Sequence, residues 1–314
     1  MDKTEAMPRT AAAQTHKRRI IKQDQLVFNA IGALLLFIFG IMCIIPFWLV
    51  IVASFTDEGA LMRNGYSLWV SEFSTSAYNL CFKSPTDIIR AYVTTIGVTA
   101  VGTVLSVLMS TMTGYVLQRK DFPWGNKLSF FFFFTTLFNG GLVPTYLIFT
   151  RTYHLKDTYW GLIIPLLFSV WNMIIAKNYM KSVPFEITES AKVDGANDVY
   201  IFFKLILPLC TPLIATLGLF AALAYWNDWY FCMLYINDST KWNLQYFLNQ
   251  MLSSVEGLKA VASAGGTIDI GSMDLPQETM KMAMTVIATG PIIFLYPFVQ
   301  KYFVKGLTIG SVKG

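Results

Sequence analysis

The chain has 314 residues, of which 54% are hydrophobic and only 14% are charged. Soluble domains carry about 25% charged residues, so this composition excludes an ordinary soluble enzyme, a disordered chain and a disulfide scaffold. The net charge of +5 fits a membrane protein whose basic residues mark its cytoplasmic segments, and we expect no nucleic-acid partner. The composition therefore predicts a protein that crosses the membrane several times.

The predicted elements begin with a polar N-terminal tail over residues 1–25, which has no signal-peptide pattern. Six apolar stretches follow, and each is long enough to cross a bilayer, which takes about 20 residues. They must be helical, because lipid offers no hydrogen-bond partner to the backbone. We predict an all-α protein with one six-helix membrane domain over residues 26–305 and a short tail over residues 306–314. The six spans are predicted at residues 26–53, 91–117, 128–150, 159–179, 209–235 and 280–303.

The distribution of Lys and Arg predicts the orientation of these spans. About twice as many basic residues fall in the tails and the even-numbered connections as in the other connections, which places both termini in the cytoplasm. Two outer connections, residues 54–90 and 236–279, are long. Long loops either contact a partner or simply connect helices, and the sequence favours neither interpretation.

The connection between the fourth and fifth spans, residues 183–208, has the pattern of a helix, a turn and a second helix. Pro184 suits the start of a helix, and the acidic Glu186 and Glu189 suit its first turns. Gly195 can adopt positive φ and so end that helix. Asn197 can cap a second short helix that runs to about residue 203. On these grounds alone the loop could equally be an amphipathic segment that lies at the membrane surface.

The same loop resembles the EAA loop of ABC importer permeases, which reads E-A-A, three residues, G, nine residues and I-x-L-P. Two positions depart mildly from that pattern, since Ser190 replaces Ala and Leu205 replaces Ile. The spacing agrees throughout, and Asp194 and Ala196 flank the glycine as in sugar-importer permeases. The matching residues are Glu189-Ser190-Ala191, Gly195 and Leu205-Ile206-Leu207-Pro208.

A second resemblance lies at the C-terminus. Residues 306–314, GLTIGSVKG, are similar to the ending GLT-x-G-x-VKG of one subunit of the maltose-type carbohydrate uptake permeases. The chain resembles most the branch of complex-polysaccharide or lipoprotein-type permeases. The resemblance implies the MetI-like permease fold and ATP-driven import of a carbohydrate, expected to be an oligosaccharide, by alternating access.

In that family the EAA loop is the coupling helix, which docks in a groove of a cytoplasmic ATPase. The resemblance implies that Glu189 accepts a charge-assisted bond from a basic residue there, that Gly195 makes the turn, and that Ala191 and Ala196 allow close packing. The implied partners are a second homologous permease, two ATPase subunits, an extracytoplasmic solute-binding protein, the oligosaccharide and membrane lipid. The residues expected to couple are Glu189, Ser190, Ala191, Asp194, Gly195, Ala196 and Pro208.

The sequence contains no Walker A motif, no H-E-x-x-H and no G-x-S-x-G. We therefore expect no catalytic residue, no metal site and no cofactor in this chain, with ATP and Mg²⁺ bound by the partner ATPase. Two alternatives remain: a secondary transporter or channel that works alone, and a membrane-embedded enzyme or scaffold. A secondary transporter usually needs an acid within the membrane, and Asp228, near the end of the fifth span, is the one candidate.

Sugars are bound by aromatic faces together with polar side chains, and several such residues fall in the predicted spans. The group at the end of the fifth span either lines the substrate path or forms an interfacial aromatic belt. Those in the third and fourth spans either line the path or pack helices. In the last outer loop, Gln245, Asn249 and Gln250 could face a sugar or the binding protein. The substrate-path candidates are Asn139, Trp171, Asn172, Trp226, Asn227 and Trp229.

Overall fold

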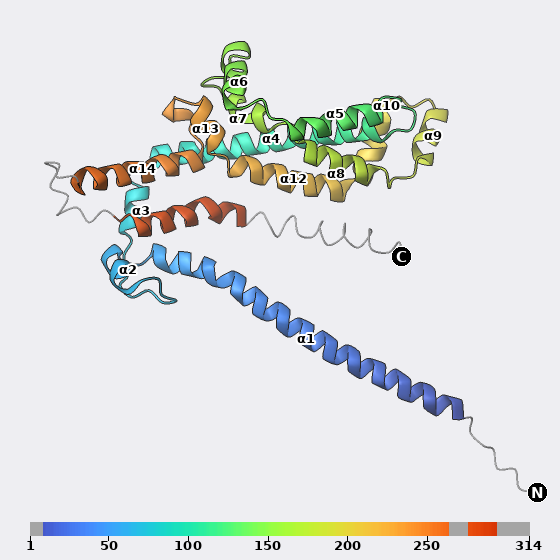
Figure 1. The fold of residues 1–314 in the computed structure, drawn as a ribbon, viewed down its shortest axis with the longest axis horizontal. Helices are drawn as coiled ribbons and strands as arrows, with labels where there is room; N and C mark the ends of the chain where they lie inside the picture. The colour runs from blue at the N-terminus through green and yellow to red at the C-terminus, as the bar shows by residue number, and fades with distance from the viewer. Residues whose placement is uncertain (1–8, 264–275, 294–314) are drawn as a thin grey trace, which may run out of the picture.

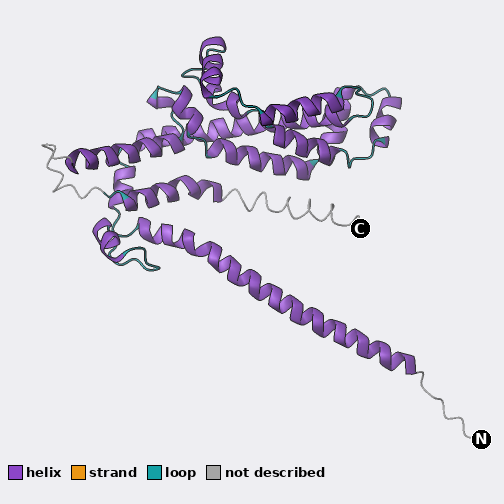
Figure 2. Ribbon diagram, in the orientation of Figure 1, coloured by secondary structure: helices purple, strands orange, loops and turns teal. Residues whose placement is uncertain are grey.

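The computed structural model describes residues 9–263 and 276–293. Helices account for nearly all of the ordered elements in these ranges, and the described part contains no strand beyond one isolated bridge between Thr56 and Phe73 (Figure 2). The all-α prediction is confirmed.

Two helices cross a membrane without a break, by length and composition. The helix α1 (Arg9–Ser54) contains the apolar segment Gln25–Ser54, and α4 covers Pro85–Gln118. These helices confirm the first two predicted spans. Only 6% of the apolar window of α1 is buried, and α1 diverges from the other helices (Figure 1).

The third, fourth and fifth predicted spans are not continuous helices, which corrects the prediction. Each is a pair of helices bent at a short break, so the described residues hold two unbroken spans, or up to five if each pair counts as one. The pairs and their bends are Gly125–Leu137 with Leu142–Thr152 (113°), Trp160–Leu166 with Val170–Met180 (53°), and Asp198–Leu209 with Thr211–Trp226 (85°).

Glycine and proline account for these breaks. Gly141 has φ of 91°, a conformation that glycine adopts without strain, and it separates α5 (Gly125–Leu137) from α6 (Leu142–Leu147). Pro165 lies within the short 3₁₀ turn η2 (Ile164–Leu166). Pro208 and Pro212 stand on either side of the bend at Cys210. Because proline lacks an N–H group, each interrupts the helical ladder.

The fifth predicted span also ends too late. The helix α12 (Thr211–Trp226) stops at Trp226, and Tyr230–Tyr235 forms a separate helix, α13. The sixth predicted span begins as a helix over residues 278–293, and residues 294–303 lie outside the described part. The remaining helices of the membrane domain and its outer connections are α2 (Glu58–Asn64), α3 (Ser76–Cys81), η1 (Ile148–Thr152), α7 (Trp160–Ile163), α8 (Val170–Met180), η4 (Ser239–Lys241) and α14 (Leu244–Ser263).

The helix α4 is the centre of the domain, and α8 and α12 pack along it (Figure 1). Its buried positions carry small residues, which let helix backbones approach closely within a membrane. At Gly114, a Cβ would lie 2.7 Å from the Cβ of Ala176 and 2.8 Å from the backbone nitrogen of Lys177. The small buried residues of α4 are Ala91, Thr94, Thr95, Gly102, Ser106, Ser110, Thr111 and Gly114.

The end of α12 lies beside the middle of α4. The ring of Tyr225 fills the space above Gly102, and its hydroxyl donates to the carbonyl of Ile163 over 2.8 Å. The chain then turns back, and α14 begins with the backbone N–H of Leu244 donating to Oγ1 of Thr95 over 2.8 Å. The ring of Tyr225 therefore lies beside the middle of α4, close to where α12 ends.

A carboxylate joins the first outer connection to the last helix. Glu58, in α2, is 7% exposed and accepts hydrogen bonds from the N–H groups of Glu278 and Thr279, each over 2.9 Å. Burial raises the pKa of the Glu58 carboxyl, but these N–H donors outweigh it and hold the pKa below its ordinary value. A negative charge suits the N-terminus of a helix, so Glu58 fixes where the helix over residues 278–293 begins.

The close packing at Gly114 predicts that a larger residue at this position destabilises the protein. We expect Gly114→Ala to lower the stability of the detergent-solubilised protein by about 1–3 kcal/mol, because the added methyl group meets backbone atoms of α8. The same substitution at Gly97, where a Cβ would meet nothing within 4 Å, serves as the control and should be neutral or slightly stabilising. Thermal unfolding followed by size-exclusion fluorescence measures both, and equal stability of the two variants would contradict the packing argument.

Candidate functional site

The loop between α8 and the fifth span forms two helices that meet at a tight turn. The helix α9 covers Glu186–Val193, and after the turn α10 (Asp198–Tyr200) continues through the π-helix η3 (Ile201–Ile206) into α11 (Leu207–Leu209). The predicted helix–turn–helix is confirmed, although its second part runs past residue 203 to Leu209. The wider π-helical turns precede Pro208, whose missing N–H and bulky ring disturb a regular α-helix.

Gly195 makes the turn as predicted. Its φ is 82°, a value that favours glycine, and the N–H of Ala196 reaches back to the carbonyl of Ala191 over 2.9 Å. The side-chain oxygen of Asn197 then accepts from the N–H of Tyr200 over 2.8 Å and caps α10. Sequence alone therefore located both ends of the turn.

The helix α9 has a packed face and a free face. Thr188 and Ala191 are buried, and Ala191 joins a core cluster that includes Ile201 and Phe202. The opposite face is exposed and presents Glu189, Ser190 and Val193, the last of which is 88% exposed. Of the other predicted coupling residues, Asp194, Gly195 and Pro208 are exposed and Ala196 is half-buried.

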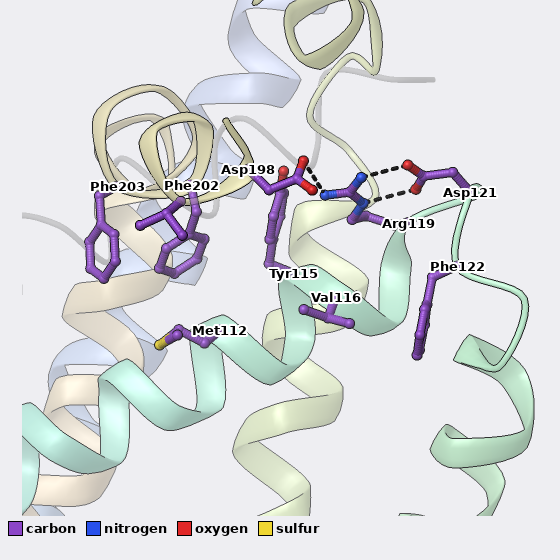
Figure 3. A pocket seen from close by; sticks show the side chains of 10 residues that line it. Met112, Tyr115, Val116, Arg119, Asp121, Phe122, Asp198, Phe202 and Phe203 are labelled. Atoms are coloured by element: carbon purple, nitrogen blue, oxygen red, sulfur yellow. Dashed lines mark hydrogen bonds and ion pairs between the residues drawn. The ribbon is translucent and has the colours of Figure 1, made fainter. Parts of the chain in front are cut away.

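An ionic cluster holds this loop against the connection between α4 and α5. Arg119 contacts Asp121 over 2.5 Å and Asp198 over 2.6 Å, and Figure 3 shows its guanidinium between the two carboxylates. Lys192, on α9, approaches Asp121 to 3.0 Å and Asp198 to 3.8 Å. The two cations and two carboxylates balance, and the side chain of Arg119 is only 12% exposed.

The carboxylates of the cluster stay charged at neutral pH. Hydrogen bonding to Arg119 is the main reason that the pKa of the Asp121 carboxyl lies well below its usual range. Sequence reasoning missed this cluster, because its members come from two loops that the chain separates by an entire helical hairpin. No spacing rule connects Arg119 with Asp198.

A pocket of about 370 Å³ lies beside the cluster, between the end of α4 and η3 (Figure 3). Its walls are mainly apolar and include Met112, Val116, Phe122 and Phe203, with Arg119 at its polar side. The ring of Tyr115 lies 5.3 Å from that of Phe202 between centroids and extends the aromatic wall into the core.

The structure does not bring the six substrate-path candidates together. Trp226 is buried at 7% exposure and its indole N–H donates to the carbonyl of Ala288 over 2.9 Å. Asn172 is also 7% exposed. Asn139 and Asn227 use their side chains locally, on the N–H of Gly141 and the carbonyl of Leu223 respectively.

Trp171 and Trp229 remain exposed, at 68% and 43%. Trp229 also lines a pocket, together with Gln245 and Asn249 of α14. Within the described residues, no three His, Cys, Asp or Glu side chains gather where a metal could bind. A role in the substrate path stays a prediction for all six residues.

Comparisons with known proteins agree with this architecture. The polygalacturonan/rhamnogalacturonan transport system permease protein YtcP of Bacillus subtilis is 41% identical over 280 residues, which cover 89% of this chain and 96% of YtcP. Protein LplC of the same organism is 39% identical over 290 residues, covering 92% and 95%. The trehalose/maltose permease MalG of Thermococcus litoralis is 26% identical over 95% of this chain and 99% of its own length.

A solved structure shares the fold along the whole chain. It is a bacterial ABC transporter involved in the import of the acidic polysaccharide alginate, and one of its chains matches with a TM-score of 0.72 and 26% identity over 96% of this chain and 100% of that chain. No family model matches the sequence. This protein belongs to the permease subunits of carbohydrate ABC importers. As such, the permease is an integral membrane protein that works with ATPase and solute-binding partners.

The ionic cluster predicts how the loop over residues 183–208 is held against the rest of the permease. We expect Asp198→Ala to weaken the attachment of α9 by about 1 kcal/mol, because it removes carboxylate partners from Arg119 and Lys192 at a partly exposed site. Hydrogen exchange of residues 186–193 should become faster, while that of α4 should not change. Asp194→Ala, on the same exposed loop but outside the cluster, is the control. Equal exchange in the two variants would show that the cluster does not hold the loop.

Proposed function

We propose that this permease forms one half of a heterodimeric pore with a second homologous permease, and that two cytoplasmic ATPase subunits drive it. The observation that carries this proposal is the free face of α9. An exposed acidic and apolar surface, on a helix fixed by a buried opposite face, suits a groove on a partner protein. The residues proposed to couple to the ATPase are Glu189, Ser190, Ala191, Asp194, Gly195, Ala196 and Pro208.

ATP and Mg²⁺ are bound by the ATPase partners in this proposal, and the permease itself is not an enzyme. The absence of a Walker A motif from the sequence supports this division of labour. Both termini lie in the cytoplasm. The excess of basic residues on that side supports this orientation, as does the start of α1 on the same side of the molecule as α9 (Figure 1).

The substrate is an acidic oligosaccharide, delivered by an extracytoplasmic solute-binding protein. Support comes from two similar proteins: YtcP is named for polygalacturonan and rhamnogalacturonan, and the matching transporter structure imports alginate. Alginate is an acidic polysaccharide. The proposal excludes a secondary transporter that works alone and a membrane-embedded enzyme, since neither explains a coupling loop.

Transport follows from rigid-body motion in this proposal. Closure of the ATPase dimer moves α9, and the ionic cluster together with the core around Ile201 and Phe202 passes that motion to α4 and η3. The breaks near Gly141 and Cys210 are the points where bent helix pairs change their angle. The pore then alternates between inward-facing and outward-facing states.

Purification from the native membrane in a mild detergent tests the composition of the complex. We expect mass spectrometry of material bound to the tagged permease to identify a second permease and a Walker-containing ATPase. A permease with Val193→Asp, on the exposed face of α9, is the control and should recover less ATPase while it keeps the second permease. Recovery of the intact permease alone, folded and in good yield, would overturn the proposal in favour of a transporter that works alone.

Glu189 is the sharpest test of coupling. We expect Glu189→Ala to leave the complex assembled but to reduce ATPase stimulation by the loaded binding protein about tenfold, because a charge-assisted bond across the interface is lost. Glu186→Ala removes an equal charge from an exposed position of the same helix and should change stimulation little. Equal effects of the two substitutions would refute a specific role for Glu189.

A further inference from the structure

We infer that the permease itself holds one sugar ring of the substrate, in a pocket between α14 and the helix over residues 278–293. This inference rests on the proposed carbohydrate transport and assigns a binding site to this subunit. The pocket has a volume of about 240 Å³, which suits a single pyranose ring and is too small for a whole oligosaccharide. Its walls include Trp229, Gln245, Asn249, Lys281, Met284 and Thr285.

The polar groups of the pocket are available to a ligand. Among the described residues, the side-chain amides of Gln245 and Asn249 and the indole N–H of Trp229 make no hydrogen bond. Gln245 is half-buried and Asn249 is exposed. The hydroxyl of Thr285 donates to the carbonyl of Lys281 over 2.8 Å, so its oxygen can still accept. Together these groups offer donors and acceptors that match sugar hydroxyl groups.

Nearby amide side chains outside the pocket form hydrogen bonds within the protein, unlike the amides that line the pocket. Gln250, the next amide on α14, donates to the hydroxyl of Tyr246 over 2.7 Å. Asn243, at the start of α14, accepts from the N–H of Tyr246 over 3.0 Å and donates to the carbonyl of Asp228. These amides are used by the fold, whereas the amides that face the pocket are not.

Trp229 supplies the apolar surface. Its side chain is 43% exposed, and binding sites typically combine an aromatic wall with a few placed polar groups. The neighbouring Trp226 cannot take this role in the described conformation, because it is buried and its N–H is bonded to Ala288. That bond nevertheless matters, since it ties the end of α12 to the helix that forms the opposite wall of the pocket.

The charges around the pocket favour hydroxyl recognition over recognition of a carboxylate. Lys281 lies 3.1 Å from a carboxylate oxygen of Glu278 and 3.5 Å from one of Glu256. Two acids therefore surround the one base, and a uronate would meet net negative charge there. We assign the pocket to a neutral ring of a mixed oligosaccharide, such as the rhamnose ring of a rhamnogalacturonan fragment, and the uronate rings of the same chain lie elsewhere. The neutral ring stacks on Trp229 and forms hydrogen bonds with the two amides.

The position of the pocket suits a transport path. Trp229 follows α12, which ends beside the middle of α4. The helix α14 covers the part of α4 that is nearer to its N-terminus, through contacts such as Leu244 with Thr95. A sugar in this pocket would therefore lie between the centre of the spanning helices and the end that faces α2 and α3 (Figure 1).

Uptake by the complete importer in proteoliposomes tests this site, with labelled oligosaccharides from a rhamnogalacturonan digest as the probe. We expect Trp229→Ala to raise the KM for uptake about tenfold and Asn249→Ala to raise it severalfold, as expected for the loss of one or two good contacts. Trp229→Phe keeps an aromatic face and should retain most of the activity. Ser254→Ala, on an exposed turn of α14 outside the pocket, is the control and should match the wild type.

A second measurement separates binding from folding. Asn249→Cys, introduced into the assembled complex, should react with a maleimide, and the digest together with the binding protein should slow that reaction. Wild-type KM values in the Trp229 and Asn249 variants, with no protection of the introduced cysteine, would overturn the site while the transport function stands. Failure of the wild-type importer to take up any carbohydrate with ATP would instead overturn the proposed function, and the inference with it.

Discussion

The architecture of this permease depends on how closely other helices can approach α4. Lipid provides no hydrophobic force between helices, so their association rests on packing and interhelical hydrogen bonds. Small residues along α4 supply that packing, most tightly at Gly114, where a single methyl group would meet the backbone of α8. At Gly102, the absence of a side chain leaves room for the ring of Tyr225 to pack against α4. These two approaches set the positions of α8 and α12, and therefore of the coupling loop that joins them.

Two functional regions lie at different points along this one helix. Near its C-terminal end, Arg119 binds the loop that carries α9. In its other half, Thr95 receives the N-terminus of α14, which forms one wall of the proposed sugar pocket. A displacement of α9 that is passed to α4 would therefore shift the wall of that pocket. In the proposed mechanism, one rigid helix and its packed neighbours are enough to connect the ATPase-binding loop with the proposed sugar pocket.

The sequence predicted the features that depend on local chemistry. Long apolar runs gave the first two spans, and Gly195 with Asn197 gave the turn of the coupling loop. It did not predict the bends, although Pro165, Pro208 and Pro212 fall in or beside the predicted spans, because a proline in a membrane helix is compatible with a mild kink as well as with a break. The ionic cluster and the different fates of Trp226 and Trp229 depend on contacts between distant segments. The local sequence does not distinguish the two tryptophans, whereas the fold buries Trp226 against the carbonyl of Ala288 and leaves Trp229 43% exposed.

In the proposed mechanism, the energies of the ion pairs and of the apolar packing around α9 indicate which of the two transmits a movement of α9. Each partly exposed ion pair of the cluster contributes about 0–1 kcal/mol, whereas burial of one large apolar side chain outside the lipid contributes about 1.5–3 kcal/mol. Ile201 and Phe202 are both almost fully buried, and they belong to the same apolar core cluster as Ala191 of α9. If α9 binds the ATPase as proposed, apolar packing would carry most of the force from α9 to the membrane helices. The ion pairs depend on defined geometry and contribute little energy, so their role in the proposal is to fix the orientation of α9.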